Sequence, residues 1–287
     1  MTMNHTNSLN IIHKAGHKFL YPFLLFAVFF AVSCSGKDRK AELYLSEAEH
    51  ALTTGNYALA KLKIDSIKIK FPESFEVIRK GFDLMQDVRM AENKRNIYYC
   101  DSMLSVNYSI LNDLKKQFTY ERDPQYQEFG NYIPNIFPLK SALMNNGLRA
   151  AVGEKGAMYI ESVLLASNIK HNQIKVSTKD GAYAESLSVT TDGLNYQFKT
   201  LDGSYEIVRF QGNDDNGVAM FIFTYKDEPL TLTFIGSGTR TIDLYGNAKK
   251  AIAQSFELST LLLEIENLKY EKGRSEALIN YLEHKTE

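Results

Sequence analysis

The sequence predicts an α+β protein in which two helical regions flank an inserted antiparallel β domain. Residues 40–118 and 248–284 repeat apolar side chains at spacings of three and four, which is the period of an amphipathic helix. Residues 159–245 alternate with a period of two, and turn-forming pairs such as Asp-Gly recur about every ten residues. This pattern is typical of consecutive β-hairpins.

Composition indicates a globular chain without an affinity for nucleic acid. The 287 residues are 44% apolar and 23% charged, which is enough for one large domain or two ordinary ones. The first 33 residues contain two lysines and no acid, so the remainder has 31 basic and 34 acidic residues, a net charge of −3. Nucleic-acid binding calls for a basic face, and this balance argues against one.

The N-terminus has the three-part order of a secretory signal peptide. Residues 1–18 are mostly polar and carry Lys14 and Lys18, and an apolar run of 14 residues follows from Phe19 to Val32. The run is shorter than the roughly 20 apolar residues that span a bilayer. Small residues close the run at Ser33, so residues 1–33 are predicted to be removed.

Cys34 follows these small residues directly, and the stretch Ala31-Val32-Ser33-Cys34 resembles the lipobox of bacterial lipoproteins. The resemblance implies that the Cys34 thiol carries acyl chains, palmitate among them, and becomes the first residue of the mature chain. Ala31 departs from the family pattern, in which leucine is commonest. The basic run from Lys37 to Lys40 favours a periplasm-facing anchor in the outer membrane. An ordinary signal peptide or an uncleaved anchor is the alternative.

Residues 34–118 are predicted to form a lipid-anchored helical region. Within it, residues 41–74 resemble one tetratricopeptide repeat at its large aromatic, small, turn and terminating positions, which are occupied here by Tyr44, Ala48, Gly55, Tyr57, Ala60 and Pro72. Leucine and tyrosine would be usual at Glu47 and Ala51. Since a single repeat is visible and such arrays need about three, a plain helical hairpin is an equal alternative.

Two long helices are predicted at residues 74–118 and within the C-terminal segment 246–287. Their apolar stripes match in length and spacing, so we expect them to pair antiparallel as a coiled-coil-like stalk. The alternatives are that each packs on its own neighbours or pairs between subunits. Cys100 lies in the first stripe and is expected to be a buried apolar residue.

The middle of the chain is expected to contain a linker and a β domain. Residues 119–156 begin with a stretch rich in aromatic residues and proline and are predicted to be the linker. Residues 157–245 are predicted to form an antiparallel meander of roughly seven or eight strands, either a barrel, a sandwich or a curved sheet. The run "VAMFIFTY" from Val218 to Tyr225 is apolar on both faces and is predicted to be a central strand.

The sequence holds no recognisable catalytic or metal-binding motif. The three histidines after the signal, His50, His171 and His284, are far apart and lack zinc-ligand spacing. No cofactor, metal or enzymatic activity is therefore expected. A grouping of serine, histidine and an acid in space stays open, because every chain of this length contains these residue types.

The sequence thus predicts a lipid-anchored, non-catalytic scaffold or interaction module with an envelope protein as its partner. The competing hypothesis is a solute- or glycan-binding lipoprotein with its ligand site in the β domain. Four tyrosines are candidates for lining such a site, although they are also ordinary strand residues: Tyr183, Tyr196, Tyr205 and Tyr225. Cys34 is the one residue to which the sequence assigns a role, and that role is attachment.

Overall fold

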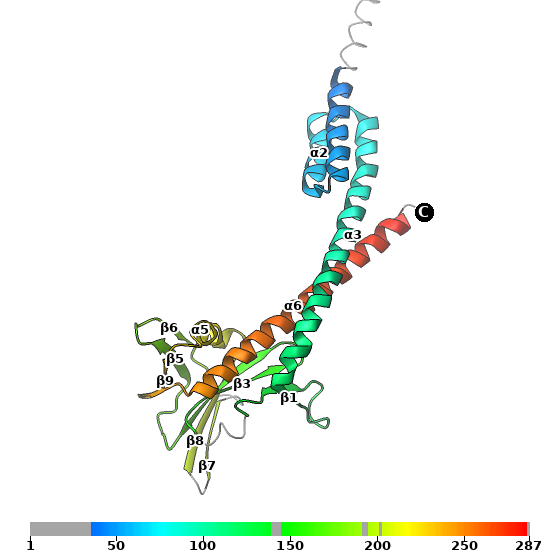
Figure 1. The fold of residues 1–287 in the computed structure, drawn as a ribbon. Helices are drawn as coiled ribbons and strands as arrows, with labels where there is room; N and C mark the ends of the chain where they lie inside the picture. Colours follow the sequence, from blue (N-terminus) through cyan, green and yellow to red (C-terminus); the bar gives the residue numbers. More distant parts are fainter. Residues whose placement is uncertain (1–35, 139–144, 191–194, 201–202, 286–287) are drawn as a thin grey trace, which may run out of the picture. The chain divides into compact units, whose positions relative to one another are not determined.

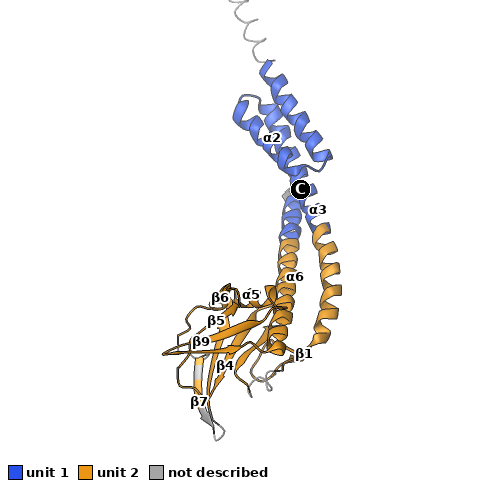
Figure 2. Cartoon of the chain, turned by 60° about the vertical axis from the view of Figure 1, so that its left-hand side comes forward, with its two compact units in different colours: residues 1–98, 274–287 blue, residues 99–273 orange. Residues whose placement is uncertain are grey.

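The computed structural model describes residues 36–138, 145–190, 195–200 and 203–285, and it has a mixed α+β fold. The chain divides into two compact units, coloured separately in Figure 2. Unit 1 contains residues 1–98 and 274–287, and unit 2 contains residues 99–273. Two helices contribute to both units: α3 (Phe75–Leu114) and α6 (Gly246–Lys285).

Unit 1 is helical in its described part. A helix over residues 36–53 is followed by a turn, by α2 (Tyr57–Lys70) and by the first half of α3. Gly55 makes the turn with a φ of +73°, a left-handed conformation that glycine adopts without a steric penalty. Asn56 then caps α2, because its side chain accepts a hydrogen bond from the backbone N–H of Leu59 at 3.2 Å.

Small residues allow the helices of unit 1 to approach closely. Ala48 and Ala60 are completely buried and pack with Val88 of α3. A second cluster near residue 41 contains Leu45 and Ile67. The burial of these residues provides the hydrophobic stabilisation of the unit.

Unit 2 contains two antiparallel sheets (Figure 1). The first sheet has six strands in the order β1-β2-β3-β4-β8-β7: β1 (Phe118–Glu121), β2 (Asn131–Pro134), β3 (Gly147–Gly153), β4 (Met158–Leu165), β8 (Gly203–Gln211) and β7 (Asn195–Thr200). The second sheet has four strands in the order β10-β9-β5-β6: β10 (Thr239–Asp243), β9 (Leu230–Ile235), β5 (Gln173–Thr178) and β6 (Tyr183–Glu185).

The main core of unit 2 is shared by both sheets and two helices. Buried side chains from β3, β4, β8, β5 and β9 meet those of α5 (Val218–Thr224) and the start of α6. Phe210 of β8, Phe234 of β9 and Ile252 of α6 are each fully buried within it. The alternating pattern of β9, with every second side chain buried, follows from its one core-facing side.

The second half of α3 packs against α6 in a second cluster of unit 2. Leu104 and Leu111 of α3 meet Leu261 and Ile265 of α6. Hydrogen bonds join Gln117 to Gln254 and Asp101 to Lys272, so the two segments run antiparallel. Cys100 lies in this cluster and is 1% exposed, which confirms its expected burial.

Parts of the predicted linker at residues 119–156 are instead strands of the first sheet. Strands β1, β2 and β3 fall within or at the edge of this range. Pro134 is compatible with this arrangement because it occupies the last position of β2, opposite Phe118 of β1. Two aromatic side chains of this region contact each other across β1 and β2, since the ring centroids of Tyr120 and Tyr132 are 5.1 Å apart.

The prediction of a central strand at Val218–Tyr225 is wrong, because this run forms the helix α5. Gly217 is the N-cap of α5, and Asp215, two residues before it, accepts a hydrogen bond from the backbone N–H of Ala219 in the first turn at 3.0 Å. Val218, Ala219 and Ile222 face the core, whereas Met220 is 57% exposed. Four-residue spacing therefore places the apolar side chains on one helical face.

The β region is also not a simple meander. Neighbouring strands pair as hairpins from β1 to β4, but β4 then pairs with β8 and β5 pairs with β9. These non-sequential pairings divide the strands into two sheets, and the described strands do not close into a barrel.

Candidate functional site

A cavity of about 920 Å³ in unit 2 is the strongest candidate for a ligand site. It opens where the β3–β4 turn, the end of β8, the 3₁₀ helix η2 (Gly212–Asp215) and α6 come together. Its walls combine apolar and polar side chains, among them Met158, Tyr159, Arg209, Asp215, Phe256 and Leu263.

Arg209 on the cavity wall is held in place by a buried carboxylate. Glu161 lies between Arg149 and Arg209 in directly paired positions of β3, β4 and β8. Its two oxygens accept hydrogen bonds from the Nε atoms of Arg149 at 2.6 Å and Arg209 at 2.8 Å. The Arg209 guanidinium also lies 4.0 Å from the ring centroid of Tyr159. These contacts fix a partly exposed cation at the edge of the cavity.

Two acids of η2 contribute the opposite charge. Asp214 and Asp215 both line the cavity. Burial raises the pKa of Asp215, and hydrogen bonds from the backbone N–H groups of Ala219 and Gly217 oppose this shift. The cavity therefore offers a guanidinium, carboxyl groups and an apolar surface, which together suit a polar solute.

The β3–β4 turn is fastened onto α6 at one wall of the cavity. Ser259 Oγ donates a hydrogen bond to the carbonyl oxygen of Gly156 at 2.6 Å. Gly156 has a φ of +94°, and a Cβ atom at this position would lie 3.0 Å from the Cγ and backbone N of Leu263. Only glycine fits such a close approach of the turn to the helix.

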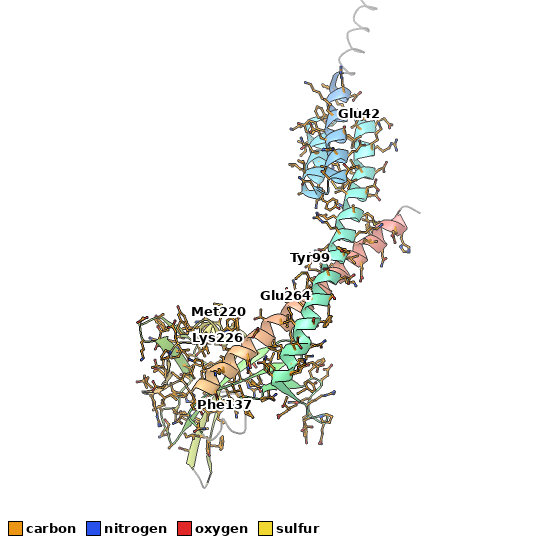
Figure 3. The ribbon with its side chains drawn as sticks, in the orientation of Figure 1. Glu42, Tyr99, Phe137, Met220, Lys226 and Glu264 are labelled. Carbon is orange, nitrogen blue, oxygen red and sulfur yellow. The ribbon has the colours of Figure 1, made fainter. Side chains whose placement is uncertain are left out.

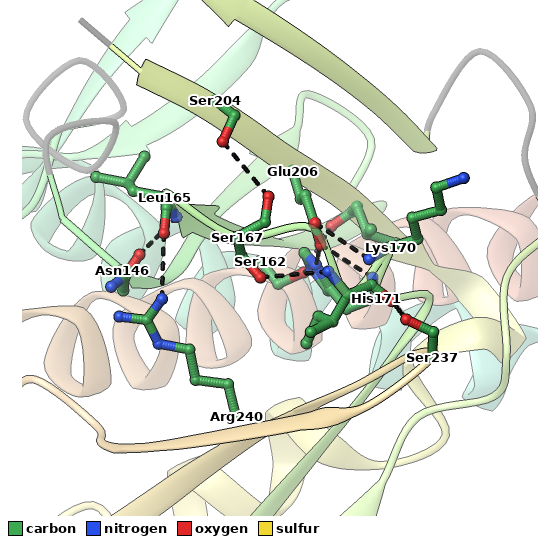
Figure 4. Close-up of polar contacts among 12 residues, drawn as sticks. Asn146, Ser162, Leu165, Ser167, Lys170, His171, Ser204, Glu206, Ser237 and Arg240 are labelled. Carbon is green, nitrogen blue, oxygen red and sulfur yellow. Dashed lines mark hydrogen bonds and ion pairs between the residues drawn. The ribbon is translucent and has the colours of Figure 1, made fainter.

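A serine, a histidine and an acid are also brought together, where the connection between β4 and β5 contacts strands β4 and β8 of the first sheet (Figure 4). Ser162 Oγ lies 2.7 Å from His171 Nε2, and His171 Nδ1 lies 2.9 Å from Glu206 Oε2. Because Glu206 accepts from Nδ1–H, Nε2 is free to accept from the Ser162 hydroxyl. The three residues are only 0%, 1% and 2% exposed, so a substrate has no access to the serine.

The Ser162–His171–Glu206 cluster serves instead to hold the connection between β4 and β5. Glu206 also accepts hydrogen bonds from the backbone N–H groups of Lys170 and His171, at 3.1 and 3.0 Å. Figure 4 shows further bonds to this connection, including Ser237 Oγ to the Ile169 carbonyl oxygen at 2.9 Å. Burial lowers the pKa of His171, and the hydrogen bond to Glu206 opposes this shift.

Of the four candidate tyrosines, three have described side chains, and two of these line one cavity. Tyr183 and Tyr225 line a second cavity of about 600 Å³, together with Met220 of α5, which Figure 3 labels. Tyr205 stacks on Phe198 of the neighbouring strand, with ring centroids 4.8 Å apart. The side chain of Tyr196 lies outside the described residues.

Unit 1 carries a groove between α2 and α3, with a volume of about 360 Å³. Ile64, Ile78, Phe82 and Met85 form its apolar surface, and the Phe82 side chain is 55% exposed. Three charged residues lie at the border of the groove: Asp65, Lys68 and Arg89.

The remaining expectations concern attachment and metals. Cys34 lies outside the described residues. The helices in the described ranges include none with a stretch apolar and long enough to cross a bilayer. Within those ranges, histidine, cysteine and acidic side chains do not gather in threes that would hold a metal ion. Comparison with protein-family models, curated proteins and solved structures finds no match to this chain.

Proposed function

We propose that this chain is a lipid-anchored cell-envelope protein that acts as a non-catalytic interaction module. In this proposal Cys34 carries the lipid in the outer membrane, the chain faces the periplasm, and another envelope protein is the partner. The observation that carries the proposal is the apolar groove between α2 and α3, with its exposed Phe82.

The groove has the character of a docking site for a partner helix. It presents apolar side chains along two neighbouring helices and has charged residues at its border. An amphipathic helix binds such a groove by placing side chains at three- and four-residue spacings into it. Lys68 and Arg89 outnumber Asp65 at the border, so they favour acidic residues beside the apolar face of the partner.

Two finer parts of the fold prediction belong to the same proposal. The complete burial of Ala48 and Ala60 and the left-handed Gly55 support a tetratricopeptide-like hairpin in unit 1. The contacts of Leu104 and Leu111 with α6 support a coiled-coil-like stalk.

The proposal that the chain is non-catalytic is supported by the burial of its one serine–histidine–acid grouping among the described residues. A nucleophile must reach a substrate carbonyl or phosphoryl group, and Ser162 is 0% exposed.

Photo-crosslinking in intact cells tests the interaction. A photoreactive amino acid at position 82 is expected to capture one reproducible envelope protein, and Phe82→Glu is expected to abolish co-purification of that protein. The matched control is position 98, because Tyr98 is 78% exposed on the same helix but does not line the groove. Equal capture at positions 82 and 98, or none at position 82, would contradict the proposal.

The cavity of about 920 Å³ favours solute binding in unit 2 as a second candidate function. Arg209 would hold an anionic group of the solute, and Tyr159 and Phe256 would contact its apolar part. Native mass spectrometry of the purified chain is expected to detect a retained small molecule that Arg209→Met loses. An unliganded mass in both proteins, also after incubation with a periplasmic extract, would reject this candidate.

A further inference from the structure

One end of unit 1 brings together three parts of the chain: residues 36–40, the end of α2 and the start of α3 (Figure 1). Ser74 Oγ donates a hydrogen bond to Asp38 Oδ1 at 2.6 Å. Lys37 Nζ lies 3.0 Å from Glu73 Oε2. The start of the described chain therefore lies against the turn between α2 and α3.

This end exposes two large apolar side chains. Ile69, close to the end of α2, is 78% exposed, and Phe75, the first residue of α3, is 76% exposed. Phe71 between them is half-buried and packs edge-on against Tyr44, with ring centroids 5.6 Å apart. The small core at this end is thus complete without Ile69 and Phe75.

The same end is rich in positive charge. Residues 36–40 and 68–75 contain five basic side chains and two acidic ones, a net charge of +3, whereas the chain after residue 33 has a net charge of −3. The basic side chains are Lys37, Arg39, Lys40, Lys68 and Lys70, and the acidic ones are Asp38 and Glu73. We call this set, with Ile69 and Phe75, the anchor-proximal patch.

We propose that the anchor-proximal patch lies on a bilayer surface that contains anionic lipids, with Ile69 and Phe75 at the boundary between headgroups and acyl chains. Apolar side chains combined with basic ones are the composition that binds such an interface. Anionic lipids complement the net positive charge of this end, and the burial of Ile69 and Phe75 adds a hydrophobic contribution.

The proposed lipidation of Cys34 would keep the anchor-proximal patch close to the membrane surface, and the inference rests on the proposed function in that respect. Gly36 is two residues after Cys34, and an extended chain covers about 3.5 Å per residue. The first helical residues would then start about 7 Å from the anchored cysteine, which is comparable to the thickness of one headgroup layer. A flexible spacer is therefore not available to hold this end away from the membrane.

A tethered protein with one fluorophore tests the inference independently of acylation in the cell. The chain has no tryptophan, so Phe75→Trp introduces a unique fluorophore. It also has two cysteines, and Cys100 is 1% exposed, which directs a maleimide lipid to Cys34 in the chain that starts there. The matched control is Tyr98→Trp, which lies 23 positions further along α3, about 35 Å at 1.5 Å per residue.

When the chain is tethered to vesicles of phosphatidylglycerol and phosphatidylethanolamine, the indole of the Phe75→Trp variant is expected to emit at shorter wavelength. Brominated acyl chains are expected to quench its emission. The indole of the Tyr98→Trp variant is expected to change in neither respect. Without the tether, the chain is expected to bind these vesicles about tenfold more tightly than phosphatidylcholine vesicles, and high salt is expected to remove the difference. Relative to the unsubstituted chain, Ile69→Ser is expected to weaken untethered binding to the anionic vesicles several-fold.

An unchanged emission spectrum of the Phe75→Trp variant on tethering would overturn the inference and leave this end free for a protein partner. Equal binding to both vesicle types would overturn the assignment to anionic lipid. The mass of the N-terminal peptide from cells tests the lipidation separately. An acylated Cys34 with an unshifted emission from position 75 would reject the membrane contact alone, whereas an unmodified Cys34 would reject the proposed anchoring.

Discussion

Glu161 lies at the centre of a buried charge row between two arginines. Its side chain is 3% exposed and that of Arg149 is 8% exposed, so both charges have lost most of their hydration. The attraction between the two charges compensates for this loss. We expect Glu161→Ala to lower the free energy of unfolding by about 3–5 kcal/mol, because it leaves the buried guanidinium of Arg149 without this carboxylate. Urea unfolding followed by circular dichroism measures the change.

The control for Glu161 is Glu266→Ala, which removes an exposed pair with Lys269. Both side chains of this pair are nearly half exposed, and such pairs contribute about 0–1 kcal/mol. Similar losses in the two variants would show that the row across β3, β4 and β8 does not stabilise unit 2.

We expect His171 to make the stability of the protein depend on pH. Its folded-state pKa lies below the ordinary value of 6.5, mainly because burial disfavours the charged ring. Well above pH 6.5 the imidazole is neutral in both states. As the pH falls below 6.5 the unfolded chain binds the proton first, so the free energy of unfolding decreases.

Between pH 7 and pH 5, the urea midpoint of the wild-type chain is therefore expected to fall more steeply than that of His171→Gln. The glutamine removes the titrating ring while retaining a polar side chain. The difference between the midpoints at the two pH values is the quantity to compare, since it is proportional to the loss of free energy even if the substitution lowers the midpoint at neutral pH. Parallel pH profiles would rule out this origin of the acid sensitivity.

At the scale of secondary-structure elements, Gly156 controls how the β3–β4 turn packs on α6. Gly156→Ala combines a left-handed φ with a Cβ atom placed 3.0 Å from Leu263. Gly181→Ala is the matched control, because Gly181 has a φ of +91° but no atom lies within 4 Å of its Cβ position. We expect the control to cost about 1–2 kcal/mol from backbone strain alone.

Gly156→Ala is expected to be clearly more destabilising than Gly181→Ala and to alter the wall of the cavity. The unfolding temperatures of the two variants are compared, and native mass spectrometry shows whether a ligand is still retained in the cavity. An equal effect of both substitutions would indicate that α6 moves away at no cost.

The elements that could be predicted from the sequence are those in which a regular apolar pattern repeats over many turns. The apolar stripes of α3 and α6 gave helix boundaries within a few residues of the observed ones, because they extend over many turns. The run at Val218–Tyr225 is apolar throughout, so it has no period that separates helix from strand. Asp215, which accepts a hydrogen bond from the first turn of the helix, lies before the run.

The polar clusters of unit 2 could not be predicted for a different reason. Ser162 and His171 are 9 positions apart and His171 and Glu206 are 35 apart, and no local motif joins them. Arg149, Glu161 and Arg209 meet only because their strands pair in a particular register. Strand order depends on non-local packing, which the pattern of one segment does not contain.

At the scale of the whole molecule, the two units suggest a division of roles. Unit 1 follows the proposed anchor directly and carries the groove and the anchor-proximal patch. Unit 2 contains both sheets and the larger cavity. We therefore propose attachment and protein contacts for unit 1 and solute binding, as the second candidate, for unit 2.

Anchoring of the chain to the membrane through Cys34 underlies both the proposed function and the proposed bilayer contact. Mass spectrometry of the N-terminal peptide from the membrane fraction tests it most directly, with Cys34→Ser as the control. We predict a mature chain that begins at Cys34 with a diacylglyceryl group on its sulfur, and we predict loss of membrane association in the control. The opposite result is a peptide that continues through Ser33 into an unmodified Cys34, from a chain that fractionates like the control. That result would contradict lipid anchoring through Cys34.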